Sequence, residues 1–392
     1  MKNLLIIAGE TSGDMHAGVV VRSLRARCPE INCWGIGGAV LREAGMEILR
    51  DVDEMDVLGF AEVVKRYSFF KNVFNEILSE VDARQPDAAL LVDYPGFNLR
   101  LAKELKKRGV KVLYYICPQV WAWKKGRIPM MADVIDRLMV IFPFEVDVFK
   151  EVALQVDFVG HPMVDGIRRF HAEQRQPLPW SEGKKIALLP GSREQEIRRI
   201  LPGLLEAAAE TEQNNLFEGG FIIAVPSGRE RLVESLLQDA AKVPSRCTVV
   251  ADNAREVLKQ ADAALVASGT ATLEAALLHC PAVLVYKANA LTYVIARCLI
   301  NIPWLGIVNI ISGREVMPER IQFDMKPKTL AADLERLVND TPQRRAMIEN
   351  FKAVEEKLGT GDPAARVTQI ICEEIGMDGP HETAGGADAA TG

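Results

Sequence analysis

The chain has 392 residues, of which 48% are hydrophobic and 26% are charged, and its formal net charge is −6. This length suits two domains that each bury a core, and the composition is that of a globular protein. The acidic balance argues against a nucleic-acid partner, because nucleic-acid binders carry a basic surplus. The seven cysteines form no C-x-x-C pair and lie mostly in apolar runs, so we expect reduced core thiols and a cytoplasmic protein.

Short apolar and β-branched runs alternate with amphipathic helical stretches, and the first run begins at residue 4, so no signal peptide is expected. The strand candidates of the first half are Leu4–Ala8, Ile31–Ile36, Ala88–Asp93, Lys111–Ile116, Leu138–Phe142 and Val156–Val159. Those of the second half are Lys185–Leu189, Phe221–Val225, Cys247–Ala251, Ala263–Ala267 and Ala282–Tyr286. This alternation predicts an α/β protein with two parallel sheets and crossover helices.

A stretch rich in proline and charge separates the two halves. We expect an N-terminal domain over residues 1–165, a linker over 166–183 and a C-terminal domain over 184–345. Helices over 346–376 are expected to cross back over both domains, and the Gly/Ala-rich tail over 377–392 is expected to be disordered. Ligands of open α/β sheets bind at the carboxyl ends of the strands, so the loops that follow strands are the candidate sites.

The segment "LLVDYPGFNLRL" places Asp93 at the end of a buried strand. A carboxylate there is partly desolvated, so its pKa can rise toward that of a useful general base. The alternative is that Asp93 only organises the turn or caps the next helix. Asn98 is a second candidate for that cap.

The segment "IALLPGSREQEI" sets Gly191, Ser192 and Arg193 between a strand and a helix. The N–H groups at a helix start can hold an anion, and an arginine can bind phosphate through two hydrogen bonds. Arg193 at a helix start is unfavourable for the helix dipole unless an anion balances it. This favours a phosphate site.

The segment "ASGTATLEAAL" repeats the arrangement with Ser268, Gly269 and Thr270, and adds Glu274 one turn into the helix. A carboxylate there can accept hydrogen bonds from a ribose while the helix start faces a diphosphate. The alternative is that Ser268 or Thr270 forms only a helix-capping arrangement with Glu274.

The segment over residues 57–78 has more apolar residues than one helix stripe needs, with Lys65, Arg66 and Lys71 set among them. An apolar helix flanked by basic residues is typical of one that binds at a membrane interface. The alternative is a helix buried between the sheet and a neighbouring element. The residues assigned to membrane contact are Phe60, Val63, Val64, Tyr67, Phe69, Phe70, Val73 and Phe74.

The acidic segment "DVDEMD" contains Asp51 and Asp53 at a spacing that metal-dependent sugar-nucleotide transferases use for a divalent cation. It does not follow an apolar strand, so a solvated acidic face is favoured and no metal site is expected.

Seven motifs occur in order, and together they resemble those of the lipid-A-disaccharide synthase family from about residue 4 to 325: "AGETSGD", "VDYPGFN", "CPQVWAW", "FVGHPMVD", "LLPGSR", "ASGTATLEAAL" and "GIVNIISGREVMPERIQ". The resemblance implies a peripheral-membrane glycosyltransferase with the GT-B fold, two Rossmann-like domains facing one cleft. It implies transfer of 2,3-diacylglucosamine from UDP-2,3-diacylglucosamine to the 6-hydroxyl of 2,3-diacylglucosamine 1-phosphate, with inversion to a β-1,6 disaccharide. No cofactor or metal is expected, the inner-leaflet surface of the inner membrane is the expected location, and a homodimer is possible.

The resemblance also assigns roles to the loops. It implies Asp93 as the base and a first loop that faces the acceptor, where an acid such as Glu10 suits sugar hydroxyls and would repel a diphosphate. Ser12 and Gly13 then allow close approach, and Asn98 lies on the acceptor side. The UDP-sugar belongs to the second domain, with the residues Gly191, Ser192, Arg193, Ser268, Gly269, Thr270, Glu274, Asn309 and Glu319.

Two other classes of protein remain open on the sequence. A UDP-N-acetylglucosamine 2-epimerase shares the fold and a similar C-terminal UDP site, but needs neither an acceptor nor a membrane helix. A non-catalytic UDP-sugar or lipid-binding protein would keep Arg193 and Glu274 and tolerate the loss of Asp93.

Overall fold

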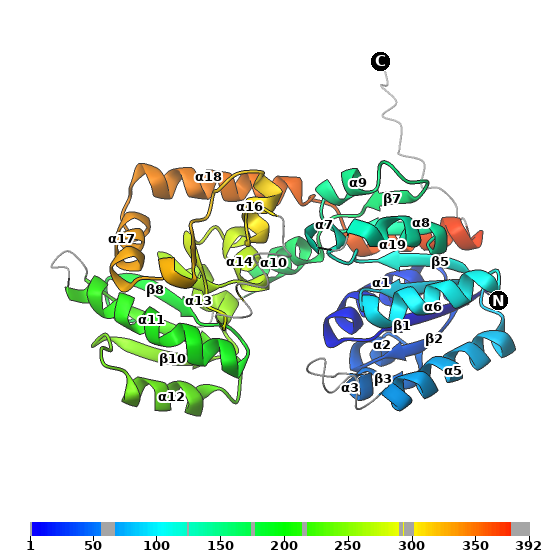
Figure 1. Cartoon of the computed structure of the whole chain (residues 1–392), viewed down its shortest axis with the longest axis horizontal. Coiled ribbons are helices and arrows are strands. Elements are labelled where there is room, and N and C mark those ends of the chain that lie inside the picture. The colour runs from blue at the N-terminus through cyan, green and yellow to red at the C-terminus, as the bar shows by residue number, and fades with distance from the viewer. Residues whose placement is uncertain are drawn as a thin grey trace, which may run out of the picture. The chain divides into compact units, whose positions relative to one another are not determined.

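The computed structural model describes residues 2–55, 67–123, 125–173, 177–213, 218–289, 293 and 302–377. The chain divides into two compact units (Figure 1). Unit 1 comprises Met1–Pro162 and Gly361–Gly392, and unit 2 comprises Met163–Thr360. The chain therefore leaves unit 1 once and returns to it after unit 2 is complete.

Unit 1 is built on a seven-stranded sheet in the order β3-β2-β1-β4-β5-β6-β7, in which every neighbouring pair is parallel. The strands are β1 (Asn3–Ala8), β2 (Asn32–Gly37), β3 (Glu47–Asp51), β4 (Ala88–Val92), β5 (Lys111–Tyr115), β6 (Arg137–Val140) and β7 (Gln155–Phe158). All five residues of β4 are buried, because a central parallel strand is covered on both faces.

The helices of unit 1 fall into two groups. Helix α1 packs on α2 and α19, whereas α6 packs on α5 and α8. The bounds are α1 (Thr11–Arg27), α2 (Ala39–Glu43), α3 (Val52–Met55), α5 (Tyr67–Arg84), α6 (Pro95–Lys107), α7 (Val120–Trp123), η1 (Lys125–Arg127), α8 (Ile128–Val134), α9 (Phe144–Val148) and α19 (Pro363–Ile375).

Unit 2 repeats the architecture on a six-stranded parallel sheet in the order β10-β9-β8-β11-β12-β13. The strands are β8 (Lys184–Leu189), β9 (Gly219–Val225), β10 (Cys247–Ala251), β11 (Ala263–Ala267), β12 (Ala282–Tyr286) and β13 (Glu319–Ile321). The helices are α10 (Pro162–Ala172), α11 (Glu194–Gln213), α12 (Glu230–Asp239), α13 (Ala254–Gln260), α14 (Thr270–Leu277), α16 (Ile307–Ser312), η2 (Gln322–Asp324), α17 (Pro327–Val338) and α18 (Pro342–Lys357). The predicted α/β class with two parallel sheets is confirmed.

The strand predictions missed two edge strands. β3 and β13 each pair with one neighbour only, and all of their residues are at least partly exposed. A strand that is not buried on both faces does not need a continuous apolar run. Because such runs were the signal for the other strands, β3 and β13 were not predicted.

The boundaries between the units differ from the expected ones. Helix α10 continues to Ala172, so the stretch 166–183 begins inside a helix that carries the chain into unit 2. The C-terminal helices are shared between the units: α18 packs on α14 and α16 in unit 2, and α19 packs on α1 and β5 in unit 1 (Figure 1). The tail predicted after residue 377 lies outside the described residues.

Candidate functional site

Asp93 directly follows β4, at the carboxyl edge of the unit 1 sheet. β1 and β4 are neighbours, so the loop that carries Glu10 lies beside it. Burial and the charge of Glu10 raise the pKa of Asp93 to about 6, against the lowering effect of a hydrogen bond from the Tyr94 N–H. The Ncap residue of α6 is Tyr94, whose side chain makes no capping hydrogen bond, so Asp93 does not occupy the N-cap position.

The first loop brings Glu10 and Ser12 to the surface at the start of α1. Gly13 is buried, and a Cβ there would lie 3.5 Å from the Ala8 Cβ, an ordinary contact. The tightest packing in this loop is at Gly9, where a Cβ would lie 2.3 Å from the ring of Tyr94. A glycine at position 9 therefore lets the Tyr94 ring cover the first loop.

Asn98 lies inside α6 and is fully buried, so the prediction that it caps the helix is wrong. Its Nδ2 donates to the carbonyl oxygens of Asp93 at 2.8 Å and Val92 at 3.2 Å. Its Oδ1 finds no hydrogen-bond partner among the described residues. Asn98 thus holds the turn that carries Asp93.

Sequence reasoning gave no role to Asp14, the last residue of "AGETSGD". Its carboxylate is buried and accepts hydrogen bonds from the backbone N–H groups of Gly38 (2.6 Å), Val40 (3.0 Å) and Leu41 (3.2 Å). These are N–H groups at the start of α2, which need such an acceptor. Of the two acids in the motif, Asp14 is buried and structural, whereas Glu10 is exposed.

A second buried carboxyl, that of Glu145, lies after β6. Burial and the charge of Asp93 raise the pKa of Glu145 to about 7, although it accepts hydrogen bonds from the Phe142 N–H at 3.2 Å and from the Trp121 Nε1 at 3.1 Å. His161 follows β7, and burial and the charge of His16 lower its pKa to about 3. The carboxyl edge of this sheet therefore gathers several groups with perturbed pKa values, as active sites do.

Of the residues assigned to membrane contact, Phe60, Val63, Val64 and the side chain of Tyr67 lie outside the described residues. Val73 on α5 is 2% exposed and belongs to the core, so its assignment to membrane contact is corrected. Phe69, Phe70 and Phe74 are partly buried and pack against that core. In the described part of this helix, the additional apolar residues therefore pack at least partly into the core of unit 1.

Asp51 pairs with Arg42 at 2.7 Å and accepts a hydrogen bond from the Asp53 N–H at 3.1 Å. The described residues contain no group of three or more His, Cys, Asp or Glu side chains that could hold a metal ion.

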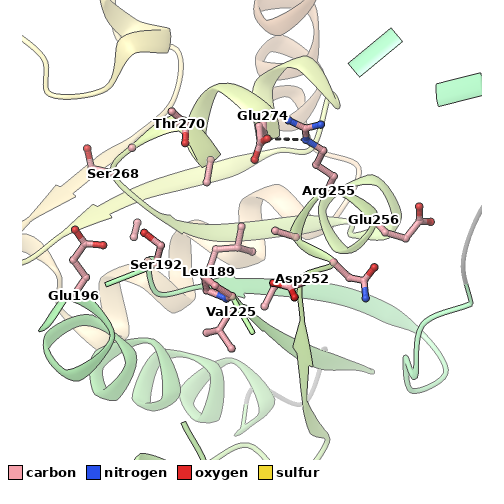
Figure 2. Close-up of a pocket in the computed structure, with 18 of the residues that line it drawn as sticks. Leu189, Ser192, Glu196, Val225, Asp252, Arg255, Glu256, Ser268, Thr270 and Glu274 are labelled. Atoms are coloured by element: carbon pink, nitrogen blue, oxygen red, sulfur yellow. Dashed lines mark hydrogen bonds and ion pairs between the residues drawn. The ribbon is translucent and has the colours of Figure 1, made fainter. Parts of the chain in front are cut away.

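A cavity of about 470 Å³ lies in unit 2 at the carboxyl ends of β8, β9, β10 and β11. It brings together the predicted residues Gly191, Ser192, Ser268, Gly269, Thr270 and Glu274. The turn after β10 and the start of α13, residues 252–256, add a wall that the sequence did not predict (Figure 2). Phe170 and Glu173 also line the cavity. Gly191 has a φ of +112°, which glycine adopts readily, so its loop can turn between strand and helix.

Arg255 and Glu274 both line the cavity and form an ion pair, with 2.7 Å between Nε and Oε1 (Figure 2). The Ncap residue of α14 is Gly269, and the structure describes no side-chain cap there, so the capping alternative for Ser268, Thr270 and Glu274 is wrong. The cavity wall thus carries a carboxylate and a guanidinium side by side.

Arg193 is not among the lining residues. Its side chain is 76% exposed and pairs with Glu196, which does line the cavity, at 3.3 Å. The arginine, which directly precedes α11, is therefore balanced by a carboxylate in the first turn of that helix.

Asn309 and Glu319 also lie outside the lining. Asn309 Nδ2 donates to Met317 O and to Glu319 Oε1, both at 2.8 Å, while its Oδ1 accepts from the Val316 and Met317 N–H groups. Glu319 accepts from the N–H groups of Leu305 and Gly306, both at 2.9 Å. In this structure the two side chains organise the loops around α16.

Comparison with known proteins agrees with the motifs. The family model described as lipid-A-disaccharide synthetase matches residues 4–368. A lipid-A-disaccharide synthase of Syntrophus aciditrophicus is 37% identical over 370 residues, covering 93% of this chain and 96% of that protein. One of Anaeromyxobacter dehalogenans is 39% identical over 372 residues, covering 94% and 96%.

Among solved structures, the fold is similar to two GT-B proteins. A Methanocaldococcus jannaschii UDP-GlcNAc 2-epimerase in complex with UDP-GlcNAc and UDP has a TM-score of 0.58 at 13% identity, covering 95% of this chain and 100% of that one. Acinetobacter baumannii MurG has a TM-score of 0.55 at 14% identity, covering 96% and 99%. These two similarities establish the fold alone, whereas the family match spans most of the sequence: the chain belongs to the lipid-A-disaccharide synthase family of glycosyltransferases.

Proposed function

We propose that this chain transfers 2,3-diacylglucosamine from UDP-2,3-diacylglucosamine to the 6-hydroxyl of 2,3-diacylglucosamine 1-phosphate, with inversion and without a metal ion. The reaction releases UDP and forms a β-1,6-linked disaccharide 1-phosphate. Family membership supports a UDP-sugar donor and a lipid acceptor. The observation that carries the mechanism is the carboxyl of Asp93, whose pKa is raised to about 6 at the edge of the unit 1 sheet.

An inverting displacement needs a base that takes the proton of the attacking hydroxyl. A carboxylate with a pKa near 6 is deprotonated at neutral pH and is a stronger base than an ordinary aspartate. Glu10, whose charge contributes to this rise, carries a carboxylate that can accept hydrogen bonds from the other hydroxyls of an acceptor sugar. We assign Asp93 as the base, and Glu10 and Ser12 to the acceptor side.

The leaving group of the reaction is UDP, which carries negative charge that must be stabilised. The cavity of unit 2 offers the starts of α11 and α14 for the diphosphate and Glu274 for the ribose hydroxyls. Arg193 is assigned to the diphosphate because an exposed guanidinium can exchange Glu196 for a phosphate. The ion pair with Arg255 orients the Glu274 carboxylate in the cavity wall.

The lipid substrates require access to a membrane. Among the described residues no helix is both long and apolar enough to cross a bilayer. We infer peripheral binding to the cytoplasmic face of the inner membrane, through the exposed parts of Phe69, Phe70 and Phe74 together with the neighbouring segment that the sequence assigns to the same surface. Nothing in the reaction requires a homodimer.

The test is to incubate the pure protein with both acylated substrates and to measure UDP and disaccharide over time. The proposal expects both products in equal amounts, with a turnover at least about 100-fold lower for Asp93→Asn, the scale of losing a general base. A protein that instead consumes UDP-N-acetylglucosamine without any acceptor is an epimerase. A protein that binds UDP tightly but forms neither product is a binding protein.

A further inference from the structure

The turn that carries Asp93 has an unusual backbone. Asp93 has a φ of +45° and Tyr94 a φ of +48°, so two consecutive non-glycine residues lie in the left-handed region. Each such residue costs on the order of 1–3 kcal/mol and persists only where its surroundings over-determine it. The question is what holds this turn.

Three hydrogen bonds hold the Asp93 peptide groups, and they come from different elements. The Tyr114 hydroxyl on β5 donates to the Asp93 carbonyl oxygen at 2.5 Å, and Asn98 Nδ2 on α6 donates to the same oxygen at 2.8 Å. The Asp93 N–H donates to the Tyr115 carbonyl oxygen at 2.9 Å. One carbonyl oxygen therefore receives two buried side-chain donors.

Burying the Tyr114 hydroxyl costs free energy unless the hydroxyl makes a hydrogen bond. The side chain is 0% exposed and lies in the core cluster beneath the sheet, where phenylalanine would fill nearly the same space without a polar group. The register pairs Leu91 with Tyr114, two residues before Asp93 on the adjacent strand, which brings the ring under the turn. Asn98 is similarly costly, because its Oδ1 is buried without a described partner.

We propose that Tyr114, together with Asn98, is a positioning residue that fixes the left-handed Asp93 peptide and so aims the Asp93 carboxylate at the acceptor hydroxyl. The inference rests on the proposed role of Asp93 as the base. Backbone conformation sets the direction of the Cα–Cβ bond, so a peptide that rotates carries the carboxylate with it. Misplacement of a reacting group by about 1 Å can cost a factor of 100 in rate.

The test is a double-mutant cycle with Tyr114→Phe and Asp93→Asn. In the native background, Tyr114→Phe should lower kcat roughly tenfold, an intermediate fraction of the full cost of misplacement, while the KM for the donor is unchanged. In the Asp93→Asn background the same change should have no further effect, because the hydroxyl acts through the carboxylate. A merely structural tyrosine would lower activity by the same factor in both backgrounds.

Tyr115→Phe is the matched control. Tyr115 is the next residue of β5, is buried to the same degree, and lies on the opposite face of the sheet, so its hydroxyl does not reach Asp93. We expect it to leave kcat within about twofold of the native value, because the turn keeps all three of its hydrogen bonds. Circular dichroism and melting temperatures establish that the compared variants are folded.

The outcomes separate this inference from the proposed function. If Asp93→Asn is strongly impaired and Tyr114→Phe has native kcat, or lowers the remaining kcat equally in both backgrounds, the positioning role is overturned and the proposed function stands. If Asp93→Asn itself retains native turnover, Asp93 is not the base, and both the proposed mechanism and the positioning role are rejected. Should Tyr114→Phe fail to fold, Asn98→Leu removes the other donor to the same carbonyl and enters the same cycle, where additivity with Asp93→Asn would again overturn the role.

Discussion

Replacing Asp93 with asparagine should make the protein less active and more stable at once. Asparagine keeps the shape of the side chain and tolerates the left-handed backbone, but it carries no charge and cannot act as a base. Activity should fall by about 100-fold or more. The gain in stability follows from the same burial that raises the pKa.

Folding raises the pKa of Asp93 from 3.8 to about 6. The folded state therefore favours the protonated carboxyl, and the carboxylate opposes folding once the pH exceeds both values. At about 1.4 kcal/mol per pH unit the cost at about pH 8 is roughly 2–3 kcal/mol, the lower figure allowing for the part of the side chain that water reaches. The cost is absent well below pH 3.8, where both states hold the proton, and it develops as the pH rises from there to about 6.

The assay is a set of melting curves for the native protein and Asp93→Asn between about pH 4 and pH 8. For a unit of this size 1 kcal/mol corresponds to about 2–4 °C, so the variant should melt several degrees higher at the upper pH, and the two should converge at the lower one. Asp51→Asn is the control with the opposite sign, because the hydrogen bond from Arg42 lowers the pKa of Asp51, so its carboxylate stabilises the fold fully above the unfolded value of 3.8. A difference for Asp93→Asn that is absent, reversed or independent of pH would refute the account of a desolvated carboxylate held beside Glu10.

Four further predictions concern the assigned roles. Glu10→Gln removes a charge that raises the pKa of Asp93, so the acidic limb of the pH profile of kcat/KM should move to lower pH. An unchanged limb would show that Glu10 does not affect the pKa of the base. Arg193→Ala should weaken UDP binding by roughly 1.5–3 kcal/mol in calorimetry, the worth of a hydrogen bond to a charged group, and unchanged affinity would remove it from the phosphate site. Activity should survive excess EDTA, and a loss that manganese or magnesium restores would contradict the metal-independent mechanism. The double variant Phe69→Ser, Phe70→Ser should bind anionic vesicles more weakly while it stays folded, whereas Val73→Ser should lower the melting temperature without a specific effect on vesicles; vesicle binding that only Val73→Ser reduces would place the membrane contact elsewhere.

The positions that the sequence predicted best are those where one local rule decides. A fully apolar run that ends in an acid predicts a carboxylate at a sheet edge, and Asp93 lies there. Strand-to-helix loops with small polar residues likewise predicted Ser192 and Thr270, and both line the cavity. In each case the sequence neighbours of the residue determine its environment.

The positions that it missed depend on which strands are neighbours. Nothing in the sequence distinguishes Arg255 from a surface arginine, but α13 packs on α14, where Arg255 pairs with Glu274. Tyr114 looks like an ordinary strand residue until the register of β4 and β5 brings its hydroxyl under Asp93. Asn309, which the resemblance assigns to the donor side, makes side-chain hydrogen bonds with Val316, Met317 and Glu319 and does not line the cavity.

The return of the chain to unit 1 has a consequence for biosynthesis. Helix α19 packs on α1, where the Sγ atoms of Cys28 and Cys372 lie 3.7 Å apart, and Glu373 pairs with Arg137 at 3.0 Å. The ribosome makes this helix after all of unit 2, so the first unit to emerge is the last to be completed, while unit 2 is contiguous and can fold on emergence. During that interval the part of α1 on which α19 packs is uncovered, and apolar surface exposed in this way makes a folding intermediate prone to aggregation. A chain that stopped at Thr360 would keep the side chains of both candidate sites and still leave the α1 face of unit 1 without its cover.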